Sequence, residues 1–457
     1  MQSAVYQVPI RSSIPVYTLV GAHILLAIAI YLFPQFASIY GSLFFLYGLL
    51  KIIQTGNKNN EAAYFAVYLA CYEIIVRMSK YEVIYEFGKY TVTLVLLIGM
   101  LMERNPRKIP VRAILYFFLL IPAIFVRSYE SFISFREHIS FNLSGPLCLM
   151  ASWLYFSGRK FTKIEFERLI FQMILPLVSL CIFIILRVPT NIDTSGFTNS
   201  TKAMSGGFGP NQVSSALGFG FFIASLSVLL RQNIFNSKIV QYVFPFAFLG
   251  FGILTFSRGG VITGIFSFLL SCVIYIQSGK GSRQFSRLFS GLVFFGIVSY
   301  LLWSFINNIT DNSISRRYES TITSKKGEAG QSGNYSNRVD IAFEDIEAFE
   351  AHPILGNGPE GSAIFRGNED FAAHTEFTRL LADHGLFGVV ALLILILSPV
   401  YYYRKRKEDN RIILIGFVSI SFLTMLHAAM RLAIPGLAFG LALIDVNLQE
   451  HSLERTG

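Results

Sequence analysis

Long apolar runs recur along this sequence, and they constrain its fold more than any other feature. Runs of about 18 apolar residues are long enough to cross a bilayer whose hydrocarbon core is about 30 Å thick. The chain is 53% hydrophobic and only 14% charged, and its mean hydropathy is +0.53. Soluble domains carry about 25% charged residues. Because a helix satisfies its own backbone polar groups in lipid, the sequence predicts an all-α, polytopic membrane bundle.

We expect about 14 membrane crossings, with about 12 as the alternative because the fourth and the last pair are the least secure. They lie near residues 16–33, 36–53, 62–78, 89–102, 111–127, 138–156, 169–187, 211–230, 239–257, 259–277, 287–306, 386–403, 411–428 and 431–448. One long polar segment interrupts this series. The chain therefore divides into N-terminal helices (1–205), core helices (206–306), a large loop with short helices (307–385) and C-terminal helices (386–457).

Basic residues are concentrated in four short loops, which predict the orientation of the chain. The four clusters are Arg104, Arg107, Lys108 and Arg112; Arg159, Lys160, Lys163 and Arg168; Lys280, Arg283 and Arg287; and Arg404, Lys405, Arg406, Lys407 and Arg411. If the crossings alternate, all four clusters fall on one side, which the positive-inside rule assigns to the cytoplasm. Both termini are then cytoplasmic and the large loop faces outward. These loops account for the net charge of +10 without a nucleic-acid partner.

Neither the cysteines nor the amino terminus indicates a further class of protein. The cysteines all lie inside apolar runs, at spacings that fit neither a disulfide framework nor a metal site: Cys71, Cys148, Cys181 and Cys272. The first apolar run lacks a preceding basic cluster and a small-residue cleavage site, so we expect an uncleaved first helix. We expect no cofactor and no metal.

The large loop contains two predicted short helices. Asn337 is suited to cap the first, which ends before Pro353 and carries alternating apolar and acidic residues, so that it could lie on the membrane surface. The second extends from about Phe371 to His384, and Gly385 is placed to end it.

Between these helices, residues 356–361 formally match the G-x-G-x-x-G pattern of dinucleotide-binding loops. No strand precedes them, and Pro359 lies inside the pattern. We interpret the segment as a tight turn that returns the chain to the bilayer.

Three histidines in the large loop are candidates for acid–base chemistry. His374 shares a face of the predicted second helix with Phe371 and Thr378, within a few turns of the membrane interface. A neutral imidazole with a pKa of about 6.5 can accept a proton from a hydroxyl group. A lone histidine on such a face is nevertheless more often structural. His352, in a turn before a proline, and His384, at a helix end, look structural or capping.

Arginines on the predicted outer side are candidates for binding an anion. Arg258 interrupts a long apolar stretch, and an arginine at this depth is costly enough to suggest function, although a snorkelling arginine is the alternative. Gly259 and Gly260 allow a ligand or another helix to approach closely. Arg431 begins a crossing on the same side, beside His427.

Other polar residues on that side have weaker support. Asn211 opens the eighth crossing, either as a helix cap or as part of a ligand site. Four further basic residues could line a groove for acidic sugars or phosphate, or could simply be solvated helix ends: Arg77, Lys80, Arg127 and Arg136. The arginine side chain suits a pyrophosphate because its planar fork forms bidentate, charge-assisted bonds.

Five short motifs, taken in order, resemble the bacterial O-antigen ligase and O-antigen polymerase superfamily. They are G-P-N-Q-V-S-S-A-L-G at 209–218, F-S-R-G-G at 256–260, Asn337-Arg338, H-P-I-L-G-N-G at 352–358 and A-H-T-E-F at 373–377. The resemblance is specific over about residues 205–390 and depends only on hydrophobicity elsewhere.

The resemblance implies a C-type glycosyltransferase of the bacterial inner membrane, acting on undecaprenyl-pyrophosphate-linked oligosaccharides on the periplasmic side. It implies that Arg258 and Arg338 bind the pyrophosphate and that His374 is the base, with inversion at the anomeric carbon. Supporting candidates are Asn211, Thr375, Glu376 and Arg431. Family members often have Asn where this chain has Thr375, which weakens the assignment of the acceptor type.

We expect a polymerase, whose acceptor is another lipid-linked repeat unit. The amino-terminal half has about seven crossings and outward basic residues able to hold a second lipid-linked chain. A ligase that transfers the glycan to the lipid A core is the alternative, and transfer to a protein is a further one. A transporter for the same lipid is an alternative from another class, and it predicts functional charges accessible from both sides. A chain-length regulator is a candidate partner.

Overall fold

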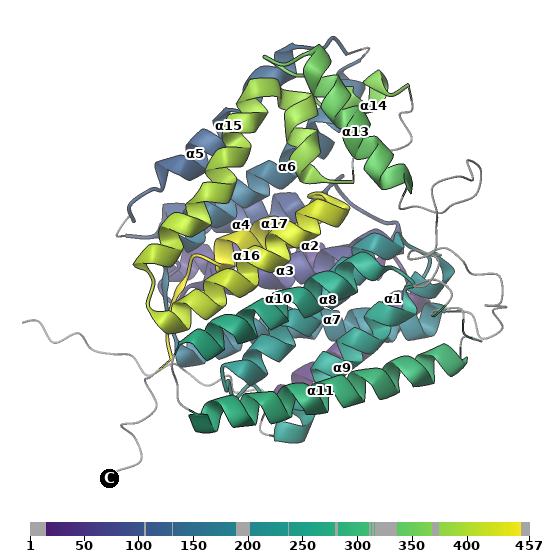
Figure 1. The fold of residues 1–457 in the computed structure, drawn as a ribbon, viewed down its shortest axis with the longest axis vertical. Coiled ribbons are helices and arrows are strands. Elements are labelled where there is room, and N and C mark those ends of the chain that lie inside the picture. Colours follow the sequence, from purple (N-terminus) through teal and green to yellow (C-terminus); the bar gives the residue numbers. More distant parts are fainter. Residues whose placement is uncertain are drawn as a thin grey trace, which may run out of the picture.

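The computed structural model is a bundle of helices with one small sheet in the part of the chain that it describes. It describes residues 15–448 except 105–106, 130, 189–201, 236, 279–281, 310–311, 313–314, 316–335 and 368–373. Among these residues, 7 helices are long and apolar enough to cross a membrane, and shorter apolar helices accompany them. The predicted all-α membrane bundle is therefore confirmed (Figure 1).

The N-terminal part of the bundle packs around one buried helix, α3, whose side chains are nearly all inaccessible. The elements are α1 (Val16–Leu32), α2 (Phe36–Thr55), α3 (Glu61–Ser79), α4 (Phe87–Met102), α5 (Val111–Phe118), the 3₁₀ turn η1 (Ile121–Phe125), α6 (Phe132–Phe156), β1 (Lys160–Thr162) and α7 (Lys163–Arg187). The predicted fifth crossing is divided between α5 and η1. Pro122 stands in η1, where its missing N–H does not support an α-helical ladder.

The C-terminal part contains the core helices and the helices of the large loop. The elements are η2 (Ala203–Ser205), α8 (Pro210–Leu229), α9 (Lys238–Leu254), α10 (Arg258–Gln277), α11 (Ser282–Ile309), α13 (Ser336–Ala351), α14 (Gly361–Phe365), α15 (Glu376–Lys405), α16 (Glu408–Ala428), α17 (Ile434–Leu441) and β2 (Asp445–Asn447). The first predicted loop helix is α13, but it begins at Ser336, so Asn337 lies inside its first turn and is not its N-cap. Helix α13 packs against α15 through Ile341, Asp345 and Ala348 rather than lying free on a surface.

Helices α8 and α10 cross at a contact that only glycine permits. A Cβ atom on Gly260 would lie 2.1 Å from the carbonyl carbon of Ser214, and one on Gly264 would lie 2.4 Å from the carbonyl oxygen of Gly218. The predicted close approach of a helix at Gly260 is therefore confirmed. The contact holds the first turns of α8 and α10 side by side.

Helix α15 is sharply bent at Gly385, whose φ of 57° and ψ of −139° are not helical. A Cβ atom on Gly388 would lie 1.8 Å from the carbonyl oxygen of Leu380, so the two parts fold back onto each other. We call residues 376–384 the short arm and residues 386–405 the long arm. The predicted boundary at Gly385 is confirmed.

The predicted start of the second loop helix is wrong. Phe371 lies outside the described residues, and the helix begins at Glu376 with Thr375 at its N-cap. The Thr375 side chain accepts a hydrogen bond from the backbone N–H of Phe377, 3.3 Å away. His374 therefore lies in the segment that precedes the helix and not on a helix face.

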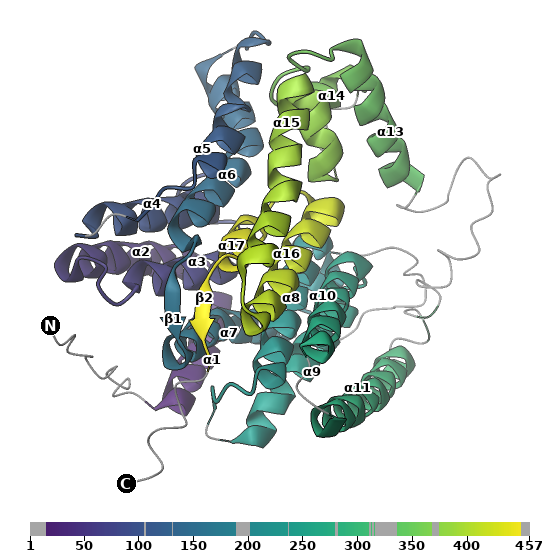
Figure 2. The same ribbon diagram turned by 60° about the vertical axis from the view of Figure 1, so that its left-hand side comes forward.

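The last predicted crossing also differs from a single helix. Only Ile434–Leu441 is helical, and the chain continues into β2, which pairs in parallel with β1 (Figure 2). The non-helical backbone is buried in protein and satisfied there, since Gly158 N–H donates to Leu443 O (3.0 Å) and Val446 N–H donates to Asn410 Oδ1 (2.8 Å). Irregular backbone at membrane depth is tolerated under this condition.

Three of the predicted basic clusters meet at this end of the bundle. Arg159 Nη2 lies 2.6 Å from Glu103 Oε1, Arg406 pairs with Asp445 of β2, and the Arg112 guanidinium stacks 4.2 Å from the ring centroid of Tyr401. These clusters come from distant parts of the sequence. Their meeting agrees with the predicted segregation of basic loops on one side.

Candidate functional site

The first turns of α8 and α10 lie at the opposite end of the bundle, which we call the site end. Ser257 Oγ donates to Asn211 Oδ1 (2.8 Å), and Ser214 Oγ donates to the carbonyl oxygen of Ser257 (2.8 Å). These bonds fix the peptide that precedes Arg258, the half-buried first residue of α10. The predicted capping role of Asn211 is wrong, because Gly209 is the N-cap of α8 and the Asn211 side chain contacts α10 instead.

Helix α16 ends against the same turn. The ring of His427 packs on Gly259, where an added Cβ atom would lie 2.4 Å from the ring. His427 Nε2 lies 3.0 Å from Ser215 Oγ, and Nδ1 lies 2.7 Å from Leu423 O. The half-buried Arg431 follows in the turn between α16 and α17. Thus Asn211, Arg258 and the segment that carries Arg431 come together.

The short arm of α15 brings His374 to the site end. Phe377 packs edge to face on Phe422 of α16, with ring centroids 6.1 Å apart. Phe422 lies between one and two turns before His427 in α16. Because His374 immediately precedes the short arm, it arrives near the end of α16, and it is half-buried there.

Helix α13 runs parallel to the short arm. Thr378 Oγ1 donates to Asp345 Oδ2 (2.7 Å), and one turn further on Asn357 Nδ2 bridges the carbonyl oxygens of Ala348 (2.9 Å) and Ala382 (2.8 Å). The contacts keep the same order along both helices. Counting back from Asp345 and Thr378, the start of the short arm at Glu376 is level with about Phe343, so the first turn of α13, to which Arg338 belongs, extends beyond it. The Arg338 side chain itself lies outside the description.

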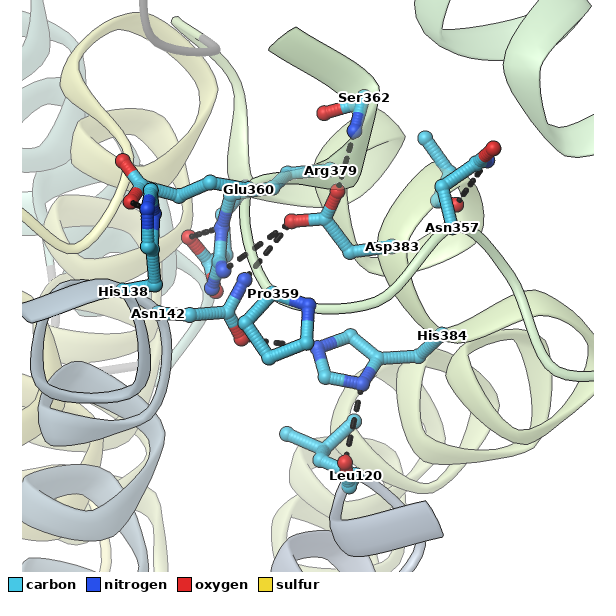
Figure 3. A network of polar contacts seen from close by, with 12 residues as sticks. Leu120, His138, Asn142, Asn357, Pro359, Glu360, Ser362, Arg379, Asp383 and His384 are labelled. Carbon is cyan, nitrogen blue, oxygen red and sulfur yellow. Dashed lines mark hydrogen bonds and ion pairs between the residues drawn. The ribbon is translucent and has the colours of Figure 1, made fainter. Parts of the chain in front are cut away.

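A buried polar network holds the upper end of the short arm, next to the bend (Figure 3). Asn142 of α6 donates from Nδ2 to Asp383 Oδ2 (2.7 Å), and its Oδ1 lies 3.1 Å from His384 Nε2. Ser362 N–H donates to Asp383 Oδ1 (3.1 Å). The side chains of Asn142, Asp383 and His384 are inaccessible to solvent. Sequence reasoning missed this network, because nothing in the sequence near Asn142 marks it as a partner of α15.

The predicted tight turn at 356–361 is confirmed, and it packs on the bend. Gly356 and Gly358 adopt φ values of 72° and 81°. A Cβ atom on Gly356 would lie 2.4 Å from the backbone of Asp383, and Gly358 N–H donates to Asp383 O (3.0 Å). The glycines thus allow close packing against α15. His352, which begins the motif at 352–358, is exposed.

Two of the named candidates are engaged in buried ion pairs. Glu376 is fully buried, and its Oε2 accepts from Arg379 Nε (3.1 Å). Arg77 pairs with Glu73 and Glu86, of which Glu73 Oε2 also accepts from Ala433 N–H (2.7 Å). Glu376 and Arg77 therefore have structural partners, and Arg77 does not line an open groove.

The other basic residues that were predicted to face outward lie apart from one another among the described contacts. Arg127 donates to the carbonyl oxygen of Pro359 (3.4 Å) and lies over the ring of Tyr129. Lys80 and Arg136 are exposed. No shared groove of these residues is evident among the described contacts.

Among the described residues of the large loop, three carboxyl groups have raised pKa values, and the largest shift is that of Asp383, whose pKa burial raises to about 6. Burial raises the pKa of Asp345 above its ordinary value, against the opposing hydrogen bond from Thr378 and the charge of Arg366. Burial likewise raises the pKa of Glu360, whose Oε2 lies 2.6 Å from His138 Nδ1. Asp345 thus connects α13 to the short arm, and Glu360 connects the large loop to α6.

One region of the chain matches a known protein family. No curated protein matches the chain. Residues 243–393 match the family model described as O-antigen ligase. This range contains Arg258, Arg338 and His374, whereas Asn211 and Arg431 lie outside it. The match covers about a third of the chain and supports the predicted resemblance to the O-antigen ligase and O-antigen polymerase superfamily.

Proposed function

We propose that the protein is a polysaccharide polymerase of the bacterial inner membrane. It transfers a glycan from undecaprenyl pyrophosphate to a hydroxyl group of another lipid-linked repeat unit, on the periplasmic side. The observation that supports this proposal is a series of contacts that links the elements carrying His374, Arg258 and Arg338. Phe377 of the short arm packs on Phe422 of α16, His427 of α16 packs on Gly259 beside Arg258, and Thr378 of the short arm donates to Asp345 of α13, the helix to which Arg338 belongs.

In the proposed reaction, His374 removes the proton from the acceptor hydroxyl as its oxygen attacks the anomeric carbon. The bond between that carbon and the phosphate oxygen breaks, and its electron pair leaves with the pyrophosphate. Attack opposite the leaving group inverts the anomeric configuration. Arg258 and Arg338 balance the negative charge that grows on the pyrophosphate, so the proposal assigns no step to a metal ion.

The start of α10 supports an anion at this position. Ser257 makes no side-chain cap to its own helix, because its hydroxyl is committed to Asn211. The first N–H groups of α10 therefore receive no side-chain cap from Ser257. The N-terminus of a helix carries a partial positive charge and attracts phosphate groups. Together with Arg258, this end of α10 is suited to a pyrophosphate.

The choice between polymerase and ligase depends on the acceptor. Helices α1 to α7 form a large unit outside the matched region, and we propose that it accommodates the second lipid-linked chain. Arg77 does not contribute to this role, since it is committed to two carboxylates. The description of the matched family favours the ligase as the second candidate, with the lipid A core as its acceptor.

The experiment that tests the proposal uses purified protein in proteoliposomes with undecaprenyl-pyrophosphate-linked repeat units and no other acceptor. A ladder of longer lipid-linked chains is the expected product. No extension, followed by transfer when lipid A core is added, would establish the ligase instead. No transfer in either mixture would contradict both and favour a transporter of the same lipid.

A further inference from the structure

The bend of α15 is fixed by a chain of three buried side chains whose hydrogen bonds can be counted (Figure 3). Asn142 lies between Asp383 and His384, at 2.7 Å and 3.1 Å. The second ring nitrogen of His384, Nδ1, lies 3.1 Å from the carbonyl oxygen of Leu120. All three side chains are fully buried, so a donor or acceptor left without a partner would be costly.

The count requires one extra proton. A carbonyl oxygen only accepts, so His384 Nδ1 must donate to Leu120. If Asn142 Oδ1 faces His384, then Nε2 must donate as well, and the ring is an imidazolium. If the Asn142 amide has the opposite orientation, its NH₂ group donates to Nε2 of a neutral His384 ring. Its oxygen then faces Asp383 Oδ2, so the Asp383 carboxyl group must be protonated. Either orientation of the amide leaves one proton shared between Asp383 and His384.

The surrounding charges also favour this proton. Arg379 lies 3.7 Å from Asp383 and is bound to Glu376, on the same arm. With the shared proton, the charges of Asp383, Glu376 and Arg379 sum to zero. Loss of the proton leaves one uncompensated negative charge in the protein interior, which is costly. Tyr116 of α5, close to Glu376, and Tyr129, close to Asp383, face the group from outside α15. Asp345 of α13 is held separately by Arg366 and Thr378.

We propose that Asn142, Asp383 and His384 are positioning residues that share one proton, and that this proton-bearing chain holds the bend of α15 and so sets the place of His374. The inference rests on the proposed role of His374 as the base. Asn142 contributes from outside the matched region 243–393, so the site depends on a residue that the matched region does not contain.

The proposal has a defined pH dependence. Burial raises the pKa of Asp383 to about 6, so the stability that its proton contributes is present at lower pH and is lost as the pH rises through about 6. Above that pKa the shared proton no longer holds the bend of α15, and the transfer rate should fall. This loss with rising pH distinguishes a shared proton from an ordinary packing contact.

The test compares wild-type protein with Asp383→Asn. In this nearly isosteric variant the NH₂ group of the new amide side chain donates to Asn142 Oδ1, the Asn142 NH₂ group donates to a neutral His384, and no extra proton is required. The ratio of the transfer rate at pH 8 to that at pH 6 should therefore be higher in Asp383→Asn than in wild-type protein, because only the wild type loses the shared proton in this range. Asp345→Asn is the matched control, a second buried carboxyl without the imidazole, and should keep the wild-type ratio.

A second variant tests the positioning role. Asn142→Leu breaks both hydrogen bonds, and it should lower kcat by about tenfold or more while the KM for the lipid donor changes by less than about twofold. If this variant does not fold, the Asp383→Asn comparison still decides. Identical pH profiles in wild type and Asp383→Asn, or an unchanged kcat in folded Asn142→Leu, would overturn the inference.

The same variants separate this inference from the proposed function. Tm against pH, measured on purified protein, should show an advantage of wild type over Asp383→Asn that shrinks as the pH rises through about 6. This readout does not require glycan transfer. A wild-type protein that transfers no glycan but shows this difference in Tm would contradict the proposed function and retain the shared proton.

Discussion

His374 lies in the segment that leads into the short arm of α15, where it is half-buried next to Thr375, the N-cap of the helix. Replacing it with Ala removes the proposed base, and the transfer rate should fall by about 10²- to 10⁴-fold. The amount of protein in the membrane and its Tm should change little, because Thr375 still caps the helix. His352→Ala, at an exposed histidine of the same loop, is the control and should transfer normally. Retained transfer in His374→Ala would remove it as the base.

Arg258 and Arg338 are tested by exchange for lysine, which keeps the charge and loses the planar fork. We expect kcat/KM to fall by an order of magnitude or so in each variant, because a point charge does not form the bidentate contact to pyrophosphate. Arg136→Lys, at an exposed position of α6, should have no effect. Wild-type rates in both variants would count against a pyrophosphate role.

Asp345 gives a stability prediction in the acid range. Its pKa is raised chiefly by burial, so the neutral form is favoured in the folded protein, and the stability it contributes is lost as the pH rises through that raised pKa. The Tm advantage of wild type over Asp345→Asn should thus be greatest near pH 4 and shrink towards about pH 6, above the ordinary Asp value. An advantage that grows with pH would show that Arg366 and Thr378 outweigh burial. Thermal unfolding of both proteins across this range decides the sign.

At the scale of elements, the bend of α15 depends on Gly385. Its backbone conformation is reserved for glycine, and an added Cβ atom would lie 2.6 Å from the nitrogen of Gly356 and from the oxygen of Ile354. Gly385→Ala should destabilise the protein by about 2–3 kcal/mol and displace the short arm, with loss of transfer. Gly296→Ala, in α11 where a Cβ atom meets nothing within 4 Å, should be neutral or slightly stabilising. A shift in Tm of the same size in both variants would contradict this account.

At the scale of the whole molecule, the N-terminal helices help to build the site end. Glu73 of α3 holds the backbone of Ala433, and Gly145 of α6 packs against Met430, where an added Cβ atom would lie 2.5 Å away. These contacts fix the turn that carries Arg431. Asn142 of α6 holds the bend of α15 in the same way. Residues 243–393 therefore do not form the site without the rest of the chain.

The metal-free reaction is a prediction for the assembled protein. Transfer by protein in proteoliposomes should continue in excess chelator, because arginines and the start of α10 are proposed to balance the charge of the leaving group. The rate with and without EDTA should agree within about twofold. Loss of transfer that a divalent ion restores would contradict the proposed mechanism.

The sequence by itself determined the class of fold and the local elements of the large loop. Apolar run lengths predicted the membrane helices, and Gly385 marked the boundary between the two arms, because helix formation and glycine backbone freedom are local properties. The motifs also predicted which region resembles a known family. The start of the short arm was mispredicted, because apolar spacing suggested a helix at His374 while the side chain of Thr375 caps the helix after it.

Only the tertiary structure decided which side chains meet. Asn211 contacts Ser257 and not its own helix end, and Arg77 forms ion pairs with the buried carboxylates of Glu73 and Glu86. Asn142 reaches α15 across more than two hundred residues of sequence. These pairings depend on how helices pack, which is set by many weak contacts and by close glycine crossings spread over the chain. The periodicity of apolar residues describes one helix at a time. It therefore identifies the apolar and polar faces of each helix but not the helix that packs against them.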